Sequence, residues 1–246
     1  MKKNENILKD FFRDAFELKS HLIEFLPINE ENFNNFLNNA KIELANIHPG
    51  DSSVENTAFY EDIVGDKHLA DLSAWHLTSK EYIASTLKLQ QKFSKKLVLD
   101  FGGGIGTHAL ANAMSENVEK VFFVDINETN RDFVKFRAEK LGLEKKISFH
   151  KSIDDTNVKN FDSIVCLDVL EHLEDPASQL DKFYKIMAED SFSIFNWYFY
   201  KGDNNEYPFH IDDEEIVSKF FETLQNKFME IFHPMLITTR VYKKKV

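Results

Sequence analysis

Residues 97–106 read Leu-Val-Leu-Asp-Phe-Gly-Gly-Gly-Ile-Gly, an apolar run that ends in an acid and breaks into a glycine-rich turn. Four of the eight glycines of the chain lie between positions 102 and 106. The apolar run predicts a buried strand. The glycines predict a turn whose backbone can approach a ligand closely, because no Cβ stands in the way. A helix is expected to follow from Thr107.

A second acid follows at a spacing typical of ribose-binding sites. Residues 121–125 read Val-Phe-Phe-Val-Asp, which predicts a strand that ends in the carboxylate of Asp125. An acid about 20 residues past the glycines is presented to the two hydroxyls of a bound ribose in open α/β sheets. A dinucleotide and S-adenosylmethionine (SAM) both fit these two features.

The acid at the end of the first strand separates the two ligands. The carboxylate of Asp100 would repel the pyrophosphate of a dinucleotide, whereas it would attract the ammonium group of SAM. A SAM site is therefore favoured, and an NAD-dependent dehydrogenase is the weakest alternative.

Three segments together resemble the class I SAM-dependent methyltransferases. They are Leu-Asp-Phe-Gly-Gly-Gly-Ile-Gly at 99–106, Val-Asp-Ile-Asn at 124–127 and Asp-Val-Leu-Glu-His-Leu at 168–173. The resemblance covers about residues 95–246. It implies an α/β fold with a Rossmann-like, seven-stranded, mostly parallel sheet that closes with a C-terminal antiparallel hairpin.

The resemblance also implies which residues hold SAM. Asp100 would bind the amino group and Asp125 the ribose hydroxyls. The methionine and ribose parts would lie against Gly102, Gly104 and Gly106.

The adenine and the floor of the site are implied in the same way. Ile126 would lie against adenine, and Asp168 and Val169 would lie under the ligand at the end of the fourth core strand. Enzymes of this kind usually offer an acid to the adenine amine after the third strand. The sequence does not choose among the candidates Ser152, Asp154 and Asp155.

Hydrophobic patterning divides the chain into two parts. Residues 1–94 are expected to be helical, with helices at about 4–26, 30–47 and 67–93, and the resemblance implies that they form an N-terminal cap over the active site. Residues 95–246 are expected to form the SAM-binding core. Its strands are predicted at 97–101, 120–125, 146–150, 162–168, 191–199, 227–233 and 235–243.

Two helix starts can be predicted within the core. Asp175 followed by Pro176 is typical of a capped helix start. Asp212 with Glu215 three residues later has the spacing of a capping box.

Catalytic groups are sought after the fourth and fifth strands, where loops line the binding crevice of such sheets. His172 is the first candidate for a base, although a helix-capping or structural role fits it equally well. Tyr198 and His210 belong to an aromatic segment that could hold an apolar ring or a cation. Trp75, on the predicted cap, could close the pocket over SAM. Glu171 and His172 are neighbours in sequence and do not predict a metal site.

The composition of the chain limits the kinds of partner that it is expected to bind. A net charge of −11 and a pI of about 5.3 disfavour nucleic acids and acidic lipid surfaces. No uncharged leader and no membrane-length apolar stretch is evident, and the single cysteine permits no internal disulfide. A cytoplasmic protein is expected, acting on a small molecule as a monomer or homodimer.

The sequence thus predicts methylation of a small-molecule acceptor at oxygen, nitrogen or carbon. Two alternatives stay open. SAM itself could be cyclised to a small-ring amino acid of the azetidine-2-carboxylate type, with release of methylthioadenosine, or the chain could be a non-catalytic SAM-binding subunit.

Overall fold

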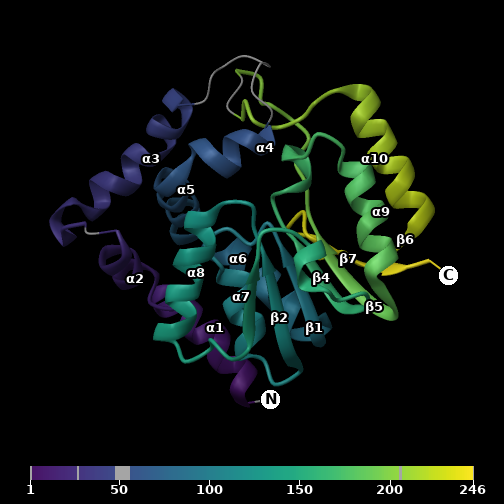
Figure 1. Cartoon of the computed structure of the whole chain (residues 1–246), viewed down its shortest axis with the longest axis horizontal. Helices are drawn as coiled ribbons and strands as arrows, with labels where there is room; N and C mark the ends of the chain where they lie inside the picture. The colour runs from purple at the N-terminus through teal and green to yellow at the C-terminus, as the bar shows by residue number, and fades with distance from the viewer. Residues whose placement is uncertain (1, 27, 48–55, 205–206, 246) are drawn as a thin grey trace.

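A computed structural model describes residues 2–26, 28–47, 56–204 and 207–245. Its centre is a seven-stranded sheet in the order β3-β2-β1-β4-β5-β7-β6, with helices on both faces (Figure 1). Strands β1 to β5 run parallel, while β7 is antiparallel to both β5 and β6. The strands are β1 (Lys96–Phe101), β2 (Val118–Val124), β3 (Ile147–His150), β4 (Phe161–Cys166), β5 (Met187–Phe195), β6 (Phe228–Phe232) and β7 (Arg240–Lys244). The predicted fold class is confirmed.

Helices occupy most of the chain before β1 and the connections between the parallel strands. Those before β1 are α1 (Lys2–Asp14), α2 (Leu18–Phe25), the 3-10 turn η1 (Glu30–Asn32), α3 (Phe33–Ile47), α4 (Asn56–Ala58), the π-helical η2 (Phe59–Ile63), α5 (Gly65–Thr78) and α6 (Lys80–Phe93). The later ones are α7 (Thr107–Met114), α8 (Glu128–Lys140), η3 (Asp154–Thr156), η4 (Leu170–His172), α9 (Pro176–Ile186) and α10 (Glu214–Lys227). Among the described residues, no helix is both long and apolar enough to cross a bilayer.

The sheet is buried on both faces, as parallel sheets are when crossover helices cover them. Alternate residues of each strand point to opposite faces. Val98 and Val165 belong to the cluster that includes helices α1, α6, α7 and α8. Leu99 and Ile164, one position away, belong to the cluster of α9 and α10.

Several strand and helix ends differ from the sequence prediction. Strand β5 ends at Phe195 instead of residue 199, because the side chain of Asn196 turns back to accept a hydrogen bond from the backbone of Asp168. The last two strands are separated by residues 233–239, not by Pro234 alone, and β7 starts only at Arg240.

The late start of β7 has a visible cause in the packing of α6. Thr239 is buried and its hydroxyl lies 3.3 Å from that of Tyr82 and 3.2 Å from that of Thr86. These contacts hold the connection against α6 before the chain enters the strand.

Of the two predicted helix starts, one is confirmed. Asp175 caps α9 through a 2.9 Å hydrogen bond from the amide of Ser178, with Pro176 in the first turn. Helix α10 is capped by Asp213 and not by Asp212, since the side chain of Asp213 accepts from two amides of the first turn. Asp212 instead forms an ion pair with Lys201.

The predicted helix at 4–26 is divided into α1 and α2. Ala15, Phe16 and Glu17 all have left-handed backbone conformations, with φ of 53°, 59° and 58°. The fully buried guanidinium of Arg137 on α8 donates to the carbonyls of Ala15 and Phe16 at 2.9 and 3.0 Å. This partner makes the break favourable because it satisfies carbonyls that the interrupted helix leaves unpaired.

Arg137 also donates to the carbonyl of Ile105 at 2.8 Å, so one side chain joins the α1–α2 break to the glycine turn. We expect Arg137→Leu to lower the free energy of unfolding by about 2–4 kcal/mol, because buried carbonyls lose a charged donor. Lys135→Leu, on the exposed face of the same helix, is the control and should change it by less than about 0.5 kcal/mol. Urea denaturation of both variants measures the difference, and equal stabilities would contradict this role of Arg137.

Candidate active site

The glycine turn between β1 and α7 has the backbone that only glycine adopts without strain. Gly102, Gly104 and Gly106 have φ of 68°, 54° and 77°. A Cβ on Gly102 would lie 2.3 Å from a methyl of Val169, and one on Gly104 would lie 2.8 Å from a methyl of Leu72. The turn is therefore packed between the end of β4 and helix α5, so these glycines are required by the protein itself as well as by any ligand.

Asp125 follows β2 and fixes the same turn. Its carboxylate accepts hydrogen bonds from the amides of Gly104 and Asn127, both at 2.9 Å, and from the Asn130 side chain at 3.3 Å. Burial raises the pKa of Asp125 to about 6, although these hydrogen bonds act in the opposite direction. The acid predicted from sequence thus lies directly against the glycine turn.

Asp100 lies at the end of β1 and is only 2% exposed. One of its carboxylate oxygens, Oδ2, has no hydrogen-bond partner among the described residues. Burial, followed by the nearby charge of Asp125, raises the pKa of Asp100 to about 7. A buried carboxylate oxygen without a partner favours a cationic ligand, and the residues at this edge therefore fit the ammonium and hydroxyl groups of SAM.

Asp168 follows β4 and completes a row of three acids along adjacent strand ends. It has a left-handed φ of 54°, which its double hydrogen bond to the side chain of Asn196 supports. Its side chain is exposed to solvent by area, yet neighbouring protein groups raise its pKa to about 6 by desolvation. Both observations are expected of a carboxylate in a recess.

The three candidate catalytic side chains come together. The rings of His172 and His210 are 4.8 Å apart between centroids, and Tyr198 lies 5.7 Å from His210. Burial lowers the pKa of His172 to about 3, with His210 adding to the effect, and burial also lowers the pKa of His210. Neutral histidines of low pKa are weak bases, so their environment suits hydrogen bonding or ligation better than proton abstraction.

Comparison with known proteins agrees with this arrangement of turn and acids. The profile of a family described as "Methyltransferase domain" matches residues 74–205, which is more than half of the chain. The chain belongs to this methyltransferase family. Its fold and glycine turn are those of the class I SAM-dependent methyltransferases.

Curated relatives match only in part. A ubiquinone biosynthesis O-methyltransferase of Psychrobacter arcticus is 30% identical over 97 residues, which is 38% of this chain and 37% of that protein. The corresponding protein of Psychrobacter cryohalolentis is 29% identical over the same length. The match thus spans little more than a third of either relative.

Solved structures share the fold. A putative O-methyltransferase of Nostoc punctiforme has a TM-score of 0.59 and 16% identity, covering 92% of this chain and 73% of that one. The N-methyltransferase NodS of Bradyrhizobium japonicum has a TM-score of 0.51 and 15% identity, covering 68% of this chain and 97% of that one.

Residues of η2 and of the first turn of α5 contact the site of this methyltransferase through side chains that follow β2. The Asn127 side chain donates to the carbonyl of Tyr60 at 2.9 Å, and Asn130 lies 3.2 Å from a ring nitrogen of His68. Asn127 also caps α8 by accepting from the amide of Asn130. An asparagine two residues after the strand-end acid was the available signal for this cap, whereas nothing local indicates His68.

Trp75 is linked to the site through Tyr82 and Asn196. It is 36% exposed, and its ring lies 5.8 Å from that of Tyr82. The Tyr82 hydroxyl accepts from the side chain of Asn196 at 3.1 Å, and Asn196 in turn holds Asp168. A direct role of Trp75 in closing the pocket stays a prediction.

The adenine candidates also stay predictions. Ser152 is occupied by Asp155, to which its hydroxyl donates at 2.8 Å, while Asp154 is exposed. Ile126 is half-buried and its carbonyl accepts from Arg131 at 2.8 Å.

The raised pKa of Asp100 makes the stability of the methyltransferase depend on pH. An acid with a higher pKa in the folded state contributes most below its unfolded value, near 4, and loses that contribution as pH rises through about 7. Asp100→Asn should therefore reduce the fall in unfolding free energy between pH 5 and pH 8 by about 1–3 kcal/mol. Urea denaturation at both pH values measures this, with the exposed Asp132→Asn as control. If the unfolding free energy of Asp100→Asn falls as much between pH 5 and pH 8 as that of the unmodified protein, ionisation of Asp100 costs the folded state little free energy.

Proposed function

We propose that this protein transfers the methyl group of SAM to a hydroxyl oxygen of a small aromatic acceptor. The observation that carries the proposal is the unpartnered carboxylate oxygen of Asp100, buried beside the glycine turn and Asp125. The Asp100 carboxylate needs a cation, and Asp125 beside it supplies acceptors for hydroxyl groups. SAM, when bound, supplies an electrophilic methyl group on a positively charged sulfur.

The residues of the strand ends would bind and orient this donor. Asp100 would pair with its ammonium group, and Asp125 would accept from its ribose hydroxyls. The left-handed turn at Gly104 is held by the Asp125 carboxylate before any ligand arrives, so binding requires little reorganisation of the loop.

The aromatic segment after β5 would bind the acceptor. Tyr198, Tyr200 and Tyr207 are each more than two-fifths exposed and gather beside His210. The rings of Tyr207 and His210 stack at 5.1 Å. Flat, partly exposed rings of this kind favour a planar acceptor, which they would align and shield from water. The name of the Psychrobacter relatives, an O-methyltransferase, supports oxygen as the acceptor atom.

Product analysis tests this function. The protein is incubated with SAM alone, with SAM and 3,4-dihydroxybenzoate, and with SAM and cell extract, and the products are identified by mass spectrometry. S-adenosylhomocysteine that appears only with an acceptor, together with an O-methylated product, is expected. Methylthioadenosine from SAM alone would instead indicate a cyclase, and SAM binding without any product would indicate a non-catalytic subunit.

Ligand binding tests the role of Asp125. We expect Asp125→Asn to weaken binding of S-adenosylhomocysteine at least tenfold, because an amide offers one acceptor where the carboxylate offers two. Isothermal titration calorimetry measures the affinity, with Asp132→Asn on the neighbouring helix as control. Equal affinities of Asp125→Asn and the unmodified protein would exclude Asp125 from the ligand site.

A further inference from the structure

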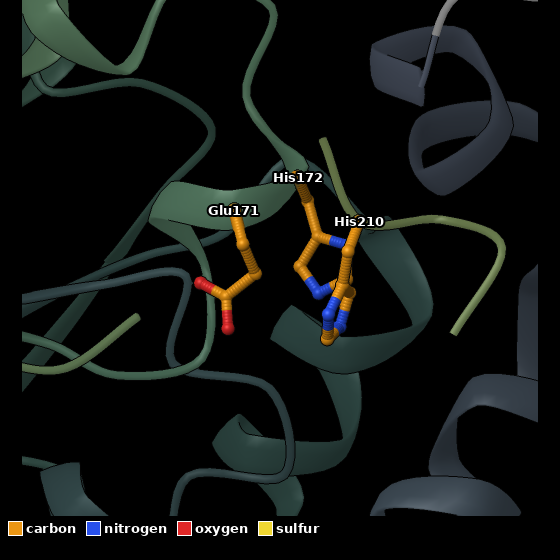
Figure 2. Close-up of side chains that lie close together, drawn as sticks. All are labelled: Glu171, His172 and His210. Carbon is orange, nitrogen blue, oxygen red and sulfur yellow. The ribbon is translucent and has the colours of Figure 1, made fainter. Parts of the chain in front are cut away.

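Three side chains from two distant segments converge beyond the end of β4. Glu171 and His172 belong to η4, and His210 lies in the segment that precedes α10. One ligand-type atom of each lies within 4.8 Å of those of the other two. Figure 2 shows the Glu171 carboxylate beside the two imidazole rings. The sequence did not predict this group, because the third member is far from the first two along the chain.

Backbone contacts hold the two segments together. The amide of Ile211 donates to the carbonyl of Glu171 at 2.8 Å. The carbonyl of Phe209 lies 3.2 Å from Nδ1 of His172. The position of His210 opposite η4 is therefore fixed by hydrogen bonds on both sides of it.

The same contacts decide which ring nitrogen of each histidine carries the proton. Nδ1 of His172 faces the carbonyl of Phe209, and Nδ1 of His210 lies 3.1 Å from the carbonyl of Tyr200. Because a carbonyl can only accept, each Nδ1 must donate, and the lone pair of each neutral ring is then on Nε2. Histidines that bind metals commonly show this arrangement, in which the other ring nitrogen donates to a backbone carbonyl. The Tyr60 hydroxyl, 3.2 Å from Nδ1 of His172, can accept from the same N–H.

Glu171 supplies the independent observation. It is 1% exposed, and its Oε2 atom has no hydrogen-bond partner within the described part of the chain. A buried carboxylate oxygen without a donor is costly unless a cation or donor joins it. The N–H of each histidine is directed to a backbone carbonyl, so neither ring supplies that donor from Nδ1.

We propose that Glu171, His172 and His210 bind a divalent transition-metal cation on the acceptor side of the site. Two imidazole nitrogens and one carboxylate oxygen suit Zn²⁺, Mn²⁺, Fe²⁺ or Co²⁺ better than Mg²⁺ or Ca²⁺, which prefer oxygen ligands. Ligands of a tetrahedral zinc ion lie about 3.3 Å apart. The ligand atoms of the three groups lie within 4.8 Å of one another, so metal binding would draw the side chains closer together.

Such a site deepens the proposed function and rests on it. Three protein ligands leave coordination positions open, as in catalytic zinc sites. An acceptor hydroxyl bound there would lose its proton to bulk water and keep the electron pair on oxygen, because the cation lowers the pKa of a bound hydroxyl. This would provide a nucleophile without a protein base.

Cobalt binding tests the site without reference to activity. Tag-free protein is dialysed against EDTA and then titrated with Co²⁺, whose visible absorption reports coordination by the protein. One equivalent of Co²⁺ is expected to bind and to be displaced by Zn²⁺. His210→Asn, which keeps a donor for the Tyr200 carbonyl, and Glu171→Gln should each weaken Co²⁺ binding at least tenfold.

Matched controls distinguish a built site from general affinity for metals. His233→Ala removes a histidine near β6 that pairs with Glu230, and it should leave Co²⁺ binding unchanged. The proposal would be overturned if the unmodified protein showed no absorption change, or if His210→Asn and Glu171→Gln bound Co²⁺ as tightly as the unmodified protein. Circular dichroism of each variant establishes that a loss of binding is not a loss of fold.

The two proposals fail separately. Calorimetry with S-adenosylhomocysteine on the EDTA-treated protein tests the SAM site alone. Suppose that S-adenosylhomocysteine binds to the EDTA-treated protein, that Co²⁺ does not bind in the titration, and that 3,4-dihydroxybenzoate is methylated equally well with and without EDTA. Only the proposed metal site is then wrong. If Co²⁺ binds but S-adenosylhomocysteine does not, the proposed methylation is wrong and the cation site stands as a binding site only.

Discussion

The carboxylate of Asp125 is the contact on which the ligand-binding edge of the sheet depends. It accepts from the amide of Gly104 in the glycine turn and from the amide of Asn127 after β2. Asn127 in turn donates to Tyr60 in the segment before α5. A single buried acid therefore fixes three parts of the chain relative to one another. Such an arrangement holds a binding loop in place before its ligand arrives, which lowers the entropy that binding must overcome.

The buried carboxylates at this edge of the sheet also favour the binding of a cation. Burial and mutual repulsion raise the pKa of Asp100 and burial raises that of Asp125, so the free protein is less stable at neutral pH than it would be without these acids. A cationic ligand that binds only the folded state removes part of this cost. The two acids thus reduce the stability of the protein at the place where a bound cationic ligand would restore it. Arg137 has a different task on the same glycine turn, where its guanidinium donates to the carbonyl of Ile105 and, across the α1–α2 break, to that of Ala15.

The proposed acceptor side combines residues inside the family match with one residue outside it. The matched region ends at residue 205, whereas His210 lies beyond it. The Glu171-His172 pair is part of the family-like motif after β4. The pair becomes a group of three possible ligands only because the segment around His210 packs against it. Two carbonyls, of Phe209 and Tyr200, then orient the imidazole rings. The donor side and the acceptor side are therefore separable parts of one site.

The sequence by itself determined the parts of this protein that depend on short-range order. A strand with Asp100 next to its end, a turn that needs glycine at 102, 104 and 106, and a strand-end acid at Asp125 follow from local apolar runs and from the left-handed backbone that glycine adopts without strain. Tertiary structure decided the rest. The break between α1 and α2 depends on a guanidinium 121 residues away from Phe16, and the grouping of His210 with η4 depends on packing across the sheet edge. Periodicity reports which face of an element is buried, but it contains no information about which distant polar group will meet that element.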